Sequence, residues 1–263
     1  MKNGILVASF GTTYKEARQL SLEAIEHAVY SAFPDFTVYE AYTSNIVKKR
    51  IQENEGLFIP GIPQALQNMY KDGIKNIYIQ PTHMIPGMEY GKILNLASQY
   101  KNKFNVLKIS EPLLSSQEDF SLAADILDKH YNFKNLESDS AAVLMGHGSG
   151  HDANKCYIQF QDTLKQKGFL NVFVSTVEGT PCFETSLNIL KNYNFKNITL
   201  IPFMVTAGDH AHNDMAGNEK SSWKNRLINL GYNIKIITQG IGEIKEIQNL
   251  YVSHLKNAIN NNF

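Results

Sequence analysis

Short apolar runs alternate with longer amphipathic segments along the whole chain, and this alternation restricts the possible folds more than any other feature. Residues 4–10 (GILVASF) form an apolar run of the kind found in buried parallel strands. A helical pattern follows over residues 14–33, and Pro63 opens another expected helix at residues 63–70. This alternation predicts an α/β fold, with a parallel sheet flanked by helices. Further strands are expected at residues 36–41, 77–80 and 104–109.

The same order recurs in the second half of the chain. The sequence KNIYIQPTHMIPGME from Lys75 matches KNITLIPFMVTAGDH from Lys196, with Pro and Gly at the same offsets. Two further matches keep this order: SFGT with GHGS, and VYEAYTS with VSTVEGT. The repeat could reflect only the strand–Pro and Gly-loop patterns common to α/β proteins, but three ordered matches favour a duplicated unit. Strands are expected at residues 142–145, 171–177, 198–204 and 234–238, and helices at 154–167, 181–193 and 244–259.

We therefore predict two similar α/β domains, at residues 1–125 and 126–240. Residues 241–263 are expected to form a C-terminal helix that packs back on them. The repeat register places Phe10 opposite His147, Tyr42 opposite Glu178, and Glu89 opposite His210.

The balanced charge gives no support for nucleic-acid binding. Lys+Arg and Asp+Glu each total 25 in the 263 residues, so the formal net charge is zero and no nucleic-acid partner is expected.

The two cysteines, Cys156 and Cys182, give neither a disulfide framework nor a zinc-ribbon spacing, as expected for a cytoplasmic protein. The N-terminal residues are interpreted as a first strand rather than a signal peptide, and no apolar run approaches a membrane span.

Three residues with metal-binding side chains follow different predicted strands of the second half: His147, Glu178 and His210. Ligands of open parallel sheets bind beyond the carboxyl ends of the strands, and imidazole and carboxylate suit a borderline divalent metal. Each residue also has an alternative interpretation. His147 could cap a helix, His210 could act only indirectly, and Glu178 could be a solvated loop charge, so Glu178 stays undecided on the residues alone.

Polar residues around the His210 loop could assist the site. Asp209 or Asp214 could orient a ligand imidazole, whereas His212 could point to solvent. In the first half, His83 and Glu89 lie opposite this loop in the repeat register and are plausible lining groups, although a lone histidine is more often structural. The basic run at residues 48–50 could reach a carboxylate ligand, but a solvated helix face explains it better.

Several common motifs are absent from the sequence. GHGSG lacks the Lys and the spacing of a phosphate-binding loop, and no G-x-G-x-x-G opens a helix. G-x-S-x-G and H-E-x-x-H are also missing, which disfavours an α/β-hydrolase and weakens the case for a metal-dependent hydrolase.

At these residues the chain resembles the anaerobic sirohydrochlorin cobaltochelatases, class II chelatases related in fold to ferrochelatase. The resemblance runs in order along essentially the whole chain, and AGDHA-x-NDMA at residues 207–216 is its most specific part. The other matching motifs are SFGT at 9–12, QALQ at 64–67, H-x-I-x-G-x-E-Y at 83–90, PLLSS at 112–116, MGHG at 145–148, VE at 177–178 and SWK-x-R at 222–226.

The resemblance implies a lyase that inserts Co²⁺ into sirohydrochlorin or precorrin-2 during corrinoid and cobalamin biosynthesis. It implies that His147, Glu178 and His210 ligate cobalt, that His147 also accepts a proton, and that the tetrapyrrole lies in a cleft between the two domains. Cobalt is then a substrate, and no organic cofactor is expected. The second domain would bind the metal while the first cradles the macrocycle. The expected location is the cytoplasm, with no membrane partner.

Contacts to the macrocycle are expected mainly from the first half. The candidate substrate-binding residues are Phe10, Gly11, Thr12, Tyr42, His83, Glu89 and Ser115. Fe²⁺ or Ni²⁺ could replace cobalt as the physiological metal, and Zn²⁺ could be accepted in vitro, because ligand type alone does not select the metal. A non-catalytic metal or tetrapyrrole carrier is the alternative from a different class, and a homo-oligomer remains open.

Overall fold

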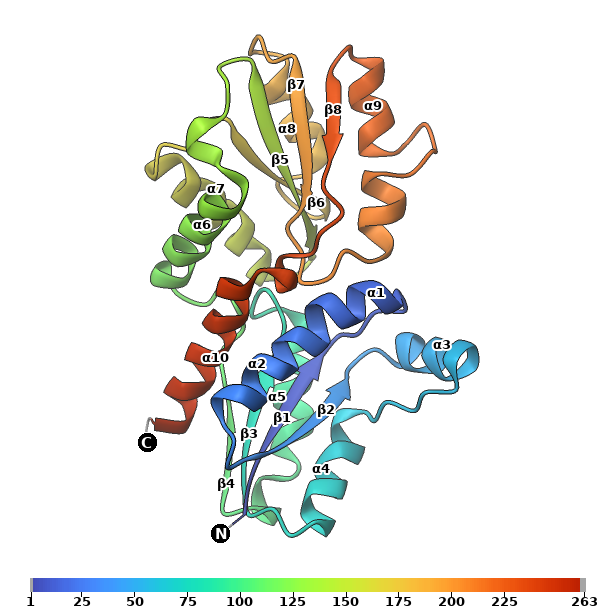
Figure 1. Cartoon of the computed structure of the whole chain (residues 1–263), viewed down its shortest axis with the longest axis vertical. Helices are drawn as coiled ribbons and strands as arrows, with labels where there is room; N and C mark the ends of the chain where they lie inside the picture. The colour runs from blue at the N-terminus through green and yellow to red at the C-terminus, as the bar shows by residue number, and fades with distance from the viewer. Residues whose placement is uncertain (1, 261–263) are drawn as a thin grey trace. The chain divides into compact units, whose positions relative to one another are not determined.

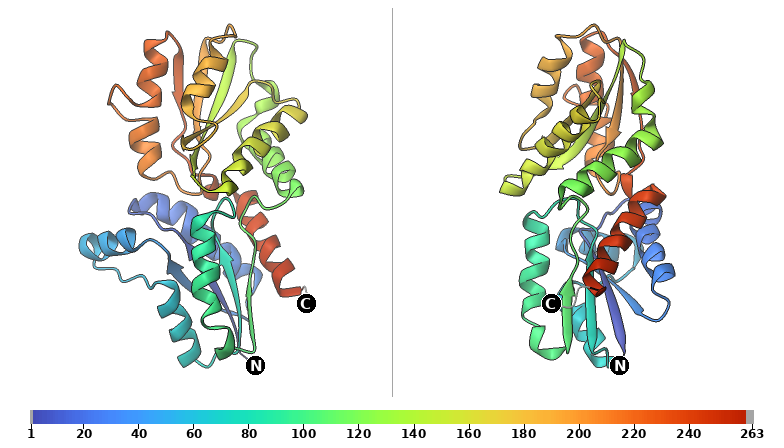
Figure 2. Two further views of the ribbon diagram at one scale, coloured as in Figure 1. Left: turned by 180° about the vertical axis from the view of Figure 1, so that it is seen from behind. Right: turned by 90° about the vertical axis from the view of Figure 1, so that its left-hand side faces the viewer.

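The computed structural model describes residues 2–260, which form two compact units (Figures 1 and 2). Unit 1 contains residues 2–115 together with 245–260, and unit 2 contains residues 116–244. The boundary predicted at residue 125 falls inside α6 (Gln117–Tyr131), and this helix belongs to unit 2. The C-terminal helix α10 (Lys245–Asn260) packs back on unit 1, as expected.

The two units contain parallel sheets with the same strand order. Within the described residues each sheet has four strands, in the order β2-β1-β3-β4 in unit 1 and β6-β5-β7-β8 in unit 2. The predicted α/β class and the two similar domains are therefore confirmed. The strands are β1 (Asn3–Ser9), β2 (Thr37–Tyr42), β3 (Asn76–Pro81), β4 (Val106–Ile109), β5 (Ser140–Gly148), β6 (Val172–Glu178), β7 (Asn197–Pro202) and β8 (Asn233–Ile236).

Helices cover both faces of the unit 1 sheet, which explains why β1 is apolar on both sides. Leu6 and Ala8 pack with residues of α4 and α5, whereas Ile5 and Val7 pack with residues of α2 and α10. Tyr251 of α10 also donates a hydrogen bond to the carbonyl oxygen of Thr82, at 3.0 Å. The helices of unit 1, besides α10, are α1 (Lys15–Ala17), α2 (Ala24–Ala32), α3 (Asn45–Glu55), α4 (Ile62–Lys71) and α5 (Met88–Ser98).

Unit 2 is layered in the same way. Helices α8 and α9 share one apolar cluster with β5 and β7, and α6 and α7 lie on the other face of the sheet (Figure 2). On that other face, Phe160 of α7 stacks on Phe203 at 4.5 Å between ring centroids. The helices of unit 2, besides α6, are α7 (Lys155–Gln166), α8 (Phe183–Leu190) and α9 (Trp223–Asn229).

Among the described residues, two segments are π-helical rather than α-helical. The helix predicted over residues 14–33 is one continuous run, but its middle turn, η1 (Arg18–Glu23), is a π-helix. The second π-segment, η5 (Ala211–Met215), follows β7 and directly succeeds His210. Single-turn π-segments often occur at functional sites. Short 3₁₀ turns complete the structure at η2 (Lys101–Lys103), η3 (Phe133–Asn135), η4 (Asp152–Asn154) and η6 (Ile241–Glu243). In the described part of the chain, no helix combines the length and apolarity needed to cross a membrane.

Candidate metal centre

His147 lies near the carboxyl end of β5, with its side chain exposed. Strand β1 ends at Ser9, whereas β5 continues through His147 to Gly148, which pairs with Glu178 of β6. The glycines on either side of His147 are required by packing. A Cβ on Gly146 would lie 2.3 Å from the Tyr157 ring, and a Cβ on Gly148 would lie 1.4 Å from the carbonyl oxygen of Glu178. Gly148 also has a φ of +83°, which side chains rarely tolerate. The GHG sequence thus holds the His147 backbone tightly between β6 and α7.

His210 lies beside His147. The two imidazole rings are 4.8 Å apart between centroids and nearly perpendicular, at 83°. The proximity follows from topology, because β5 and β7 are neighbours in the sheet and their carboxyl ends share one edge. The structure therefore brings together the two histidines that the sequence selects.

Glu178 is the last residue of β6, and its backbone adjoins Gly148. Its side chain is exposed. Across residues 2–260, no three His, Cys, Asp or Glu side chains are grouped in a way that could hold a metal ion. Glu178 is therefore placed at the same edge as the histidine pair, but its carboxylate does not complete a set of three ligands in this structure.

A hydrogen bond fixes one nitrogen of each imidazole. Nδ1 of His147 lies 2.9 Å from the carbonyl oxygen of Gly148, and Nδ1 of His210 lies 2.6 Å from Oδ2 of Asp214. Both partners are acceptors when Asp214 is ionised, so in the neutral form of each imidazole Nδ1 carries the hydrogen and Nε2 has the lone pair. Two such imidazoles can bind a divalent cation or accept a proton through Nε2.

The residues predicted to contact substrate from unit 1 gather at the carboxyl edge of its sheet. Phe10 is 46% exposed directly after β1, whereas Thr12 is buried and accepts a hydrogen bond from the Tyr14 amide. Gly11 has a φ of +96°, and a Cβ there would lie 2.4 Å from the ring of the buried Tyr42. Tyr42 therefore supports this loop from beneath, while Phe10 projects from it.

His83, Glu89 and Ser115 follow the other strands of the same sheet. Both ring nitrogens of His83 are buried without hydrogen-bond partners, and burial lowers the pKa of His83 to about 4. Glu89 accepts a hydrogen bond from Thr43 Oγ1 at 2.9 Å and forms an ion pair with Lys92. The exposed Ser115 donates to the carbonyl oxygen of Pro112.

The basic run at residues 48–50 lies in α3, where residues 49 and 50 are exposed. Lys49 forms an exposed ion pair with Glu53. Lys48 is half-buried, and burial lowers its pKa.

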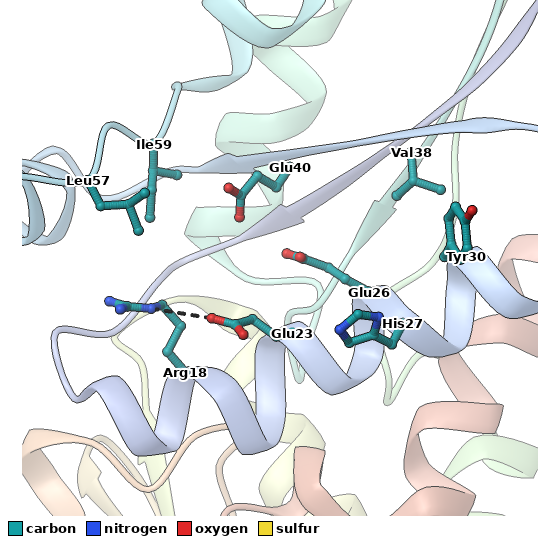
Figure 3. A pocket seen from close by; sticks show the side chains of 9 residues that line it. All are labelled: Arg18, Glu23, Glu26, His27, Tyr30, Val38, Glu40, Leu57 and Ile59. Atoms are coloured by element: carbon teal, nitrogen blue, oxygen red, sulfur yellow. Dashed lines mark ion pairs between the residues drawn. The ribbon is translucent and has the colours of Figure 1, made fainter.

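A separate hollow of about 430 Å³ lies within unit 1, between the helix formed by η1 and α2 and the strand β2 (Figure 3). Its wall contains Arg18, Glu23, Glu26 and Glu40. Burial, and to a smaller extent the charges of Glu40 and Glu23, raise the pKa of Glu26 to about 8, and Oε1 of Glu26 is buried without a hydrogen-bond partner. Among the described residues, these carboxylates do not form a group that could hold a metal ion, and the hollow is not assigned to the metal centre.

Two residues near these sites were missed by the sequence analysis. Arg18 is 4% exposed and pairs through both Nη atoms with Glu55, at 3.0 and 2.5 Å, so the start of the first helix is tied to the end of α3. Tyr157 is buried beneath the His147 loop, where burial raises its pKa to about 12 and backbone hydrogen bonding from Gly148 and His147 partly offsets that rise. Their positions in amphipathic helices suggest burial, but no sequence pattern identifies these partners.

Comparison with known proteins supports this description. A family profile described as Cobalt chelatase (CbiK) matches residues 3–260. The chain is 32% identical over 260 residues to the sirohydrochlorin cobaltochelatase of Salmonella typhimurium (strain LT2), an alignment that covers 99% of this chain and 97% of the relative. It is 29% identical over 260 residues to the sirohydrochlorin cobaltochelatase CbiKC of Nitratidesulfovibrio vulgaris (strain Hildenborough), covering 98% of this chain and 91% of the relative.

Solved structures with low sequence identity share the fold. SirB from Bacillus subtilis, solved with Fe³⁺, gives a TM-score of 0.64 at 15% identity and covers 99% of this chain and 97% of its own. CbiX, described as the terminal enzyme for siroheme biosynthesis in denitrifying bacteria, gives 0.60 at 15% identity and covers 97% of this chain and 99% of its own. The fold, the order of the strands and the match to the family over nearly the whole length agree. The chain therefore belongs to the cobalt chelatase (CbiK) family.

Proposed function

We propose that this chain is a sirohydrochlorin cobaltochelatase, which inserts Co²⁺ into sirohydrochlorin at an early step of corrinoid biosynthesis. The observation that carries the proposal is the His147–His210 pair at the carboxyl edge of the unit 2 sheet, in a chain whose relatives carry this name over their full length. Cobalt enters as a substrate. Two imidazoles with free Nε2 atoms suit an ion that must be bound and then released, unlike a closed thiolate site.

Metal insertion also needs a base. A free-base tetrapyrrole must lose two pyrrole N–H protons as the divalent cation enters, and a base near the ring centre lowers the barrier to that loss. We assign this role to His147, whose exposed side chain keeps a lone pair on Nε2. His147 and His210 would both bind the metal, and Nε2 of His147 would release it before accepting a pyrrole proton. Glu178 is proposed as a further oxygen ligand because its strand end adjoins Gly148.

We propose that the carboxyl edge of the unit 1 sheet holds the rim of the macrocycle. The exposed Phe10 ring can pack on an apolar face of the tetrapyrrole, and the backbone N–H groups of the Gly11–Thr12 loop can donate to its carboxylates. Neither Cys156 nor Cys182 forms a disulfide within the described residues, which fits a reducing compartment, and we propose a cytoplasmic location.

The direct test mixes the purified chain, Co²⁺ and sirohydrochlorin, and follows the change in tetrapyrrole absorption against a protein-free control. Acceleration proportional to protein concentration is expected. If the chain binds both substrates without accelerating insertion, it is a carrier and not a chelatase. Parallel reactions with Fe²⁺, Ni²⁺ and Zn²⁺ measure metal preference.

His147→Ala tests the assignment of the base and should reduce kcat by at least about 100-fold, the usual contribution of a positioned general base. His130→Ala is the matched control, because His130 belongs to the same unit and contacts Gln239. Retention of full turnover by His147→Ala would remove His147 from the mechanism.

A further inference from the structure

The imidazoles of His147 and His210 differ in the acceptor that is hydrogen-bonded to Nδ1. The partner of His147 is a neutral carbonyl oxygen, that of Gly148, at 2.9 Å. The partner of His210 is the Asp214 carboxylate, at 2.6 Å. A hydrogen bond to an ionised acceptor is shorter and roughly twice as strong as one to a neutral acceptor. His210 is therefore held more firmly than His147.

The backbone around His210 makes this contact possible. His210 directly precedes η5, and Asp214 lies four residues later within that π-helical turn. Residues four apart on a helix are neighbours on its surface, so the carboxylate reaches back to the imidazole. Sequence alone offers Asp209 and Asp214 as candidates for this role. In the structure, Oδ1 of Asp209 accepts a hydrogen bond from Asn213 at 2.9 Å, and Asp214 contacts the imidazole.

We propose that Asp214 is a positioning residue that holds His210 in its Nδ1–H tautomer and fixes the direction of its ring, so that Nε2 is the atom offered to Co²⁺. This inference rests on the proposed function, because it assumes that His210 binds the metal. Carboxylate partners of metal-binding imidazoles commonly act in this way, and their removal weakens metal binding by roughly 10- to 100-fold.

The first experiment measures Co²⁺ binding by the full chain without tetrapyrrole, using the visible absorption of the bound ion. Asp214→Ala should weaken Co²⁺ binding by at least about 10-fold. Asp214→Asn, which keeps a neutral acceptor of the same shape, should fall between the wild type and Asp214→Ala. The matched control is Asp162→Ala, which removes an exposed aspartate of α7 in the same unit and should bind Co²⁺ like the wild type.

A second readout is independent of metal and of turnover. ¹⁵N NMR of the histidine rings in the metal-free chain should show the Nδ1–H tautomer for His210 in the wild type and its loss in Asp214→Ala. In turnover assays, Asp214→Ala should raise the KM for Co²⁺ more than it lowers kcat, because chemistry at His147 is left intact. A purely structural role for Asp214 would not change the tautomer.

The outcomes separate this inference from the proposed function. If Asp214→Ala binds Co²⁺ within twofold of Asp162→Ala while His210→Ala binds it poorly, the positioning role is wrong and the metal assignment stands. If His210→Ala binds Co²⁺ as tightly as the wild type, the assignment of His210 as a ligand fails, and the role of Asp214 fails with it.

Discussion

Glu26 should make the stability of unit 1 depend on pH. Its carboxyl lies in the hollow between η1–α2 and β2, facing Glu40 of β2, with Glu23 and Arg18 on its own helical run and Tyr42 nearby (Figure 3). Burial and the two neighbouring carboxylates raise the pKa of Glu26 from 4.5 to about 8. Burial and the charge of Glu23 also raise the pKa of Glu40. Folding therefore favours the protonated form of both groups.

The direction of the effect follows from proton linkage. Between pH 4.5 and about 8 the unfolded chain loses the Glu26 proton while the folded chain keeps it, so the free energy of unfolding falls as pH rises. Each pKa unit corresponds to about 1.4 kcal/mol, which gives a ceiling of about 5 kcal/mol across this range. Relaxation of the pocket and entry of water reduce the ceiling, and we expect about 2–4 kcal/mol. Below pH 4.5 both states are protonated, so the free energy of unfolding is no longer reduced by Glu26 and no longer changes with pH on its account.

Glu26→Gln removes the titrating group and keeps its shape. The variant should match the wild type within about 1 kcal/mol near pH 5 and exceed it by about 2–4 kcal/mol at pH 8.5. Urea unfolding followed by far-UV circular dichroism measures this difference, and fluorescence of Trp223, in unit 2, separates the transition of that unit. The control is Glu53→Gln, which removes an exposed glutamate of α3. Parallel stability curves for Glu26→Gln and wild type from pH 5 to 8.5 would refute the reasoning.

Two further substitutions test the packing of unit 2. Gly148→Ala should destabilise the unit by more than about 3 kcal/mol, because the new Cβ would lie 1.4 Å from the Glu178 carbonyl oxygen and residue 148 has a φ of +83°. Urea unfolding monitored by Trp223 fluorescence measures this loss. A loss below about 1 kcal/mol would contradict the close contact between Gly148 and Glu178. Ser116→Ala removes the capping box that Ser116 forms with Asp119 at the start of α6, and should cost about 1 kcal/mol in the same assay, whereas Ser116→Thr should retain most of the stability.

Much of the fold can be predicted from the sequence, because buried parallel strands are nearly continuous apolar runs. All eight strands in residues 2–260 coincide with predicted runs to within a few residues, and the sequence repeat corresponds to the repeated strand order. Three helices, α5, α6 and α9, were not predicted, and α3 was predicted only as a solvated helix face at residues 48–50. In α3 the polar run around residues 48–50 hides the pattern, because only Ile51 of the helix is buried.

The candidate site could be predicted only in part. Its histidines follow neighbouring strands, so topology brings His147 and His210 together. The direction of the Glu178 side chain depends on the local backbone geometry at the end of β6, and no sequence motif predicts that geometry. The choice between Asp209 and Asp214 likewise depends on the π-helical turn after His210, and no sequence pattern distinguishes that turn from an α-helical one.

The central claim is that unit 2 holds the substrate metal on the histidine pair. The most direct test is the crystal structure of the full chain soaked with Co²⁺, using anomalous differences measured at the cobalt edge. The account predicts a strong peak within about 2.2 Å of Nε2 of both His147 and His210, with the Glu178 carboxylate turned toward it. A cobalt peak at His83 or Glu26, with none at the histidine pair, would contradict it.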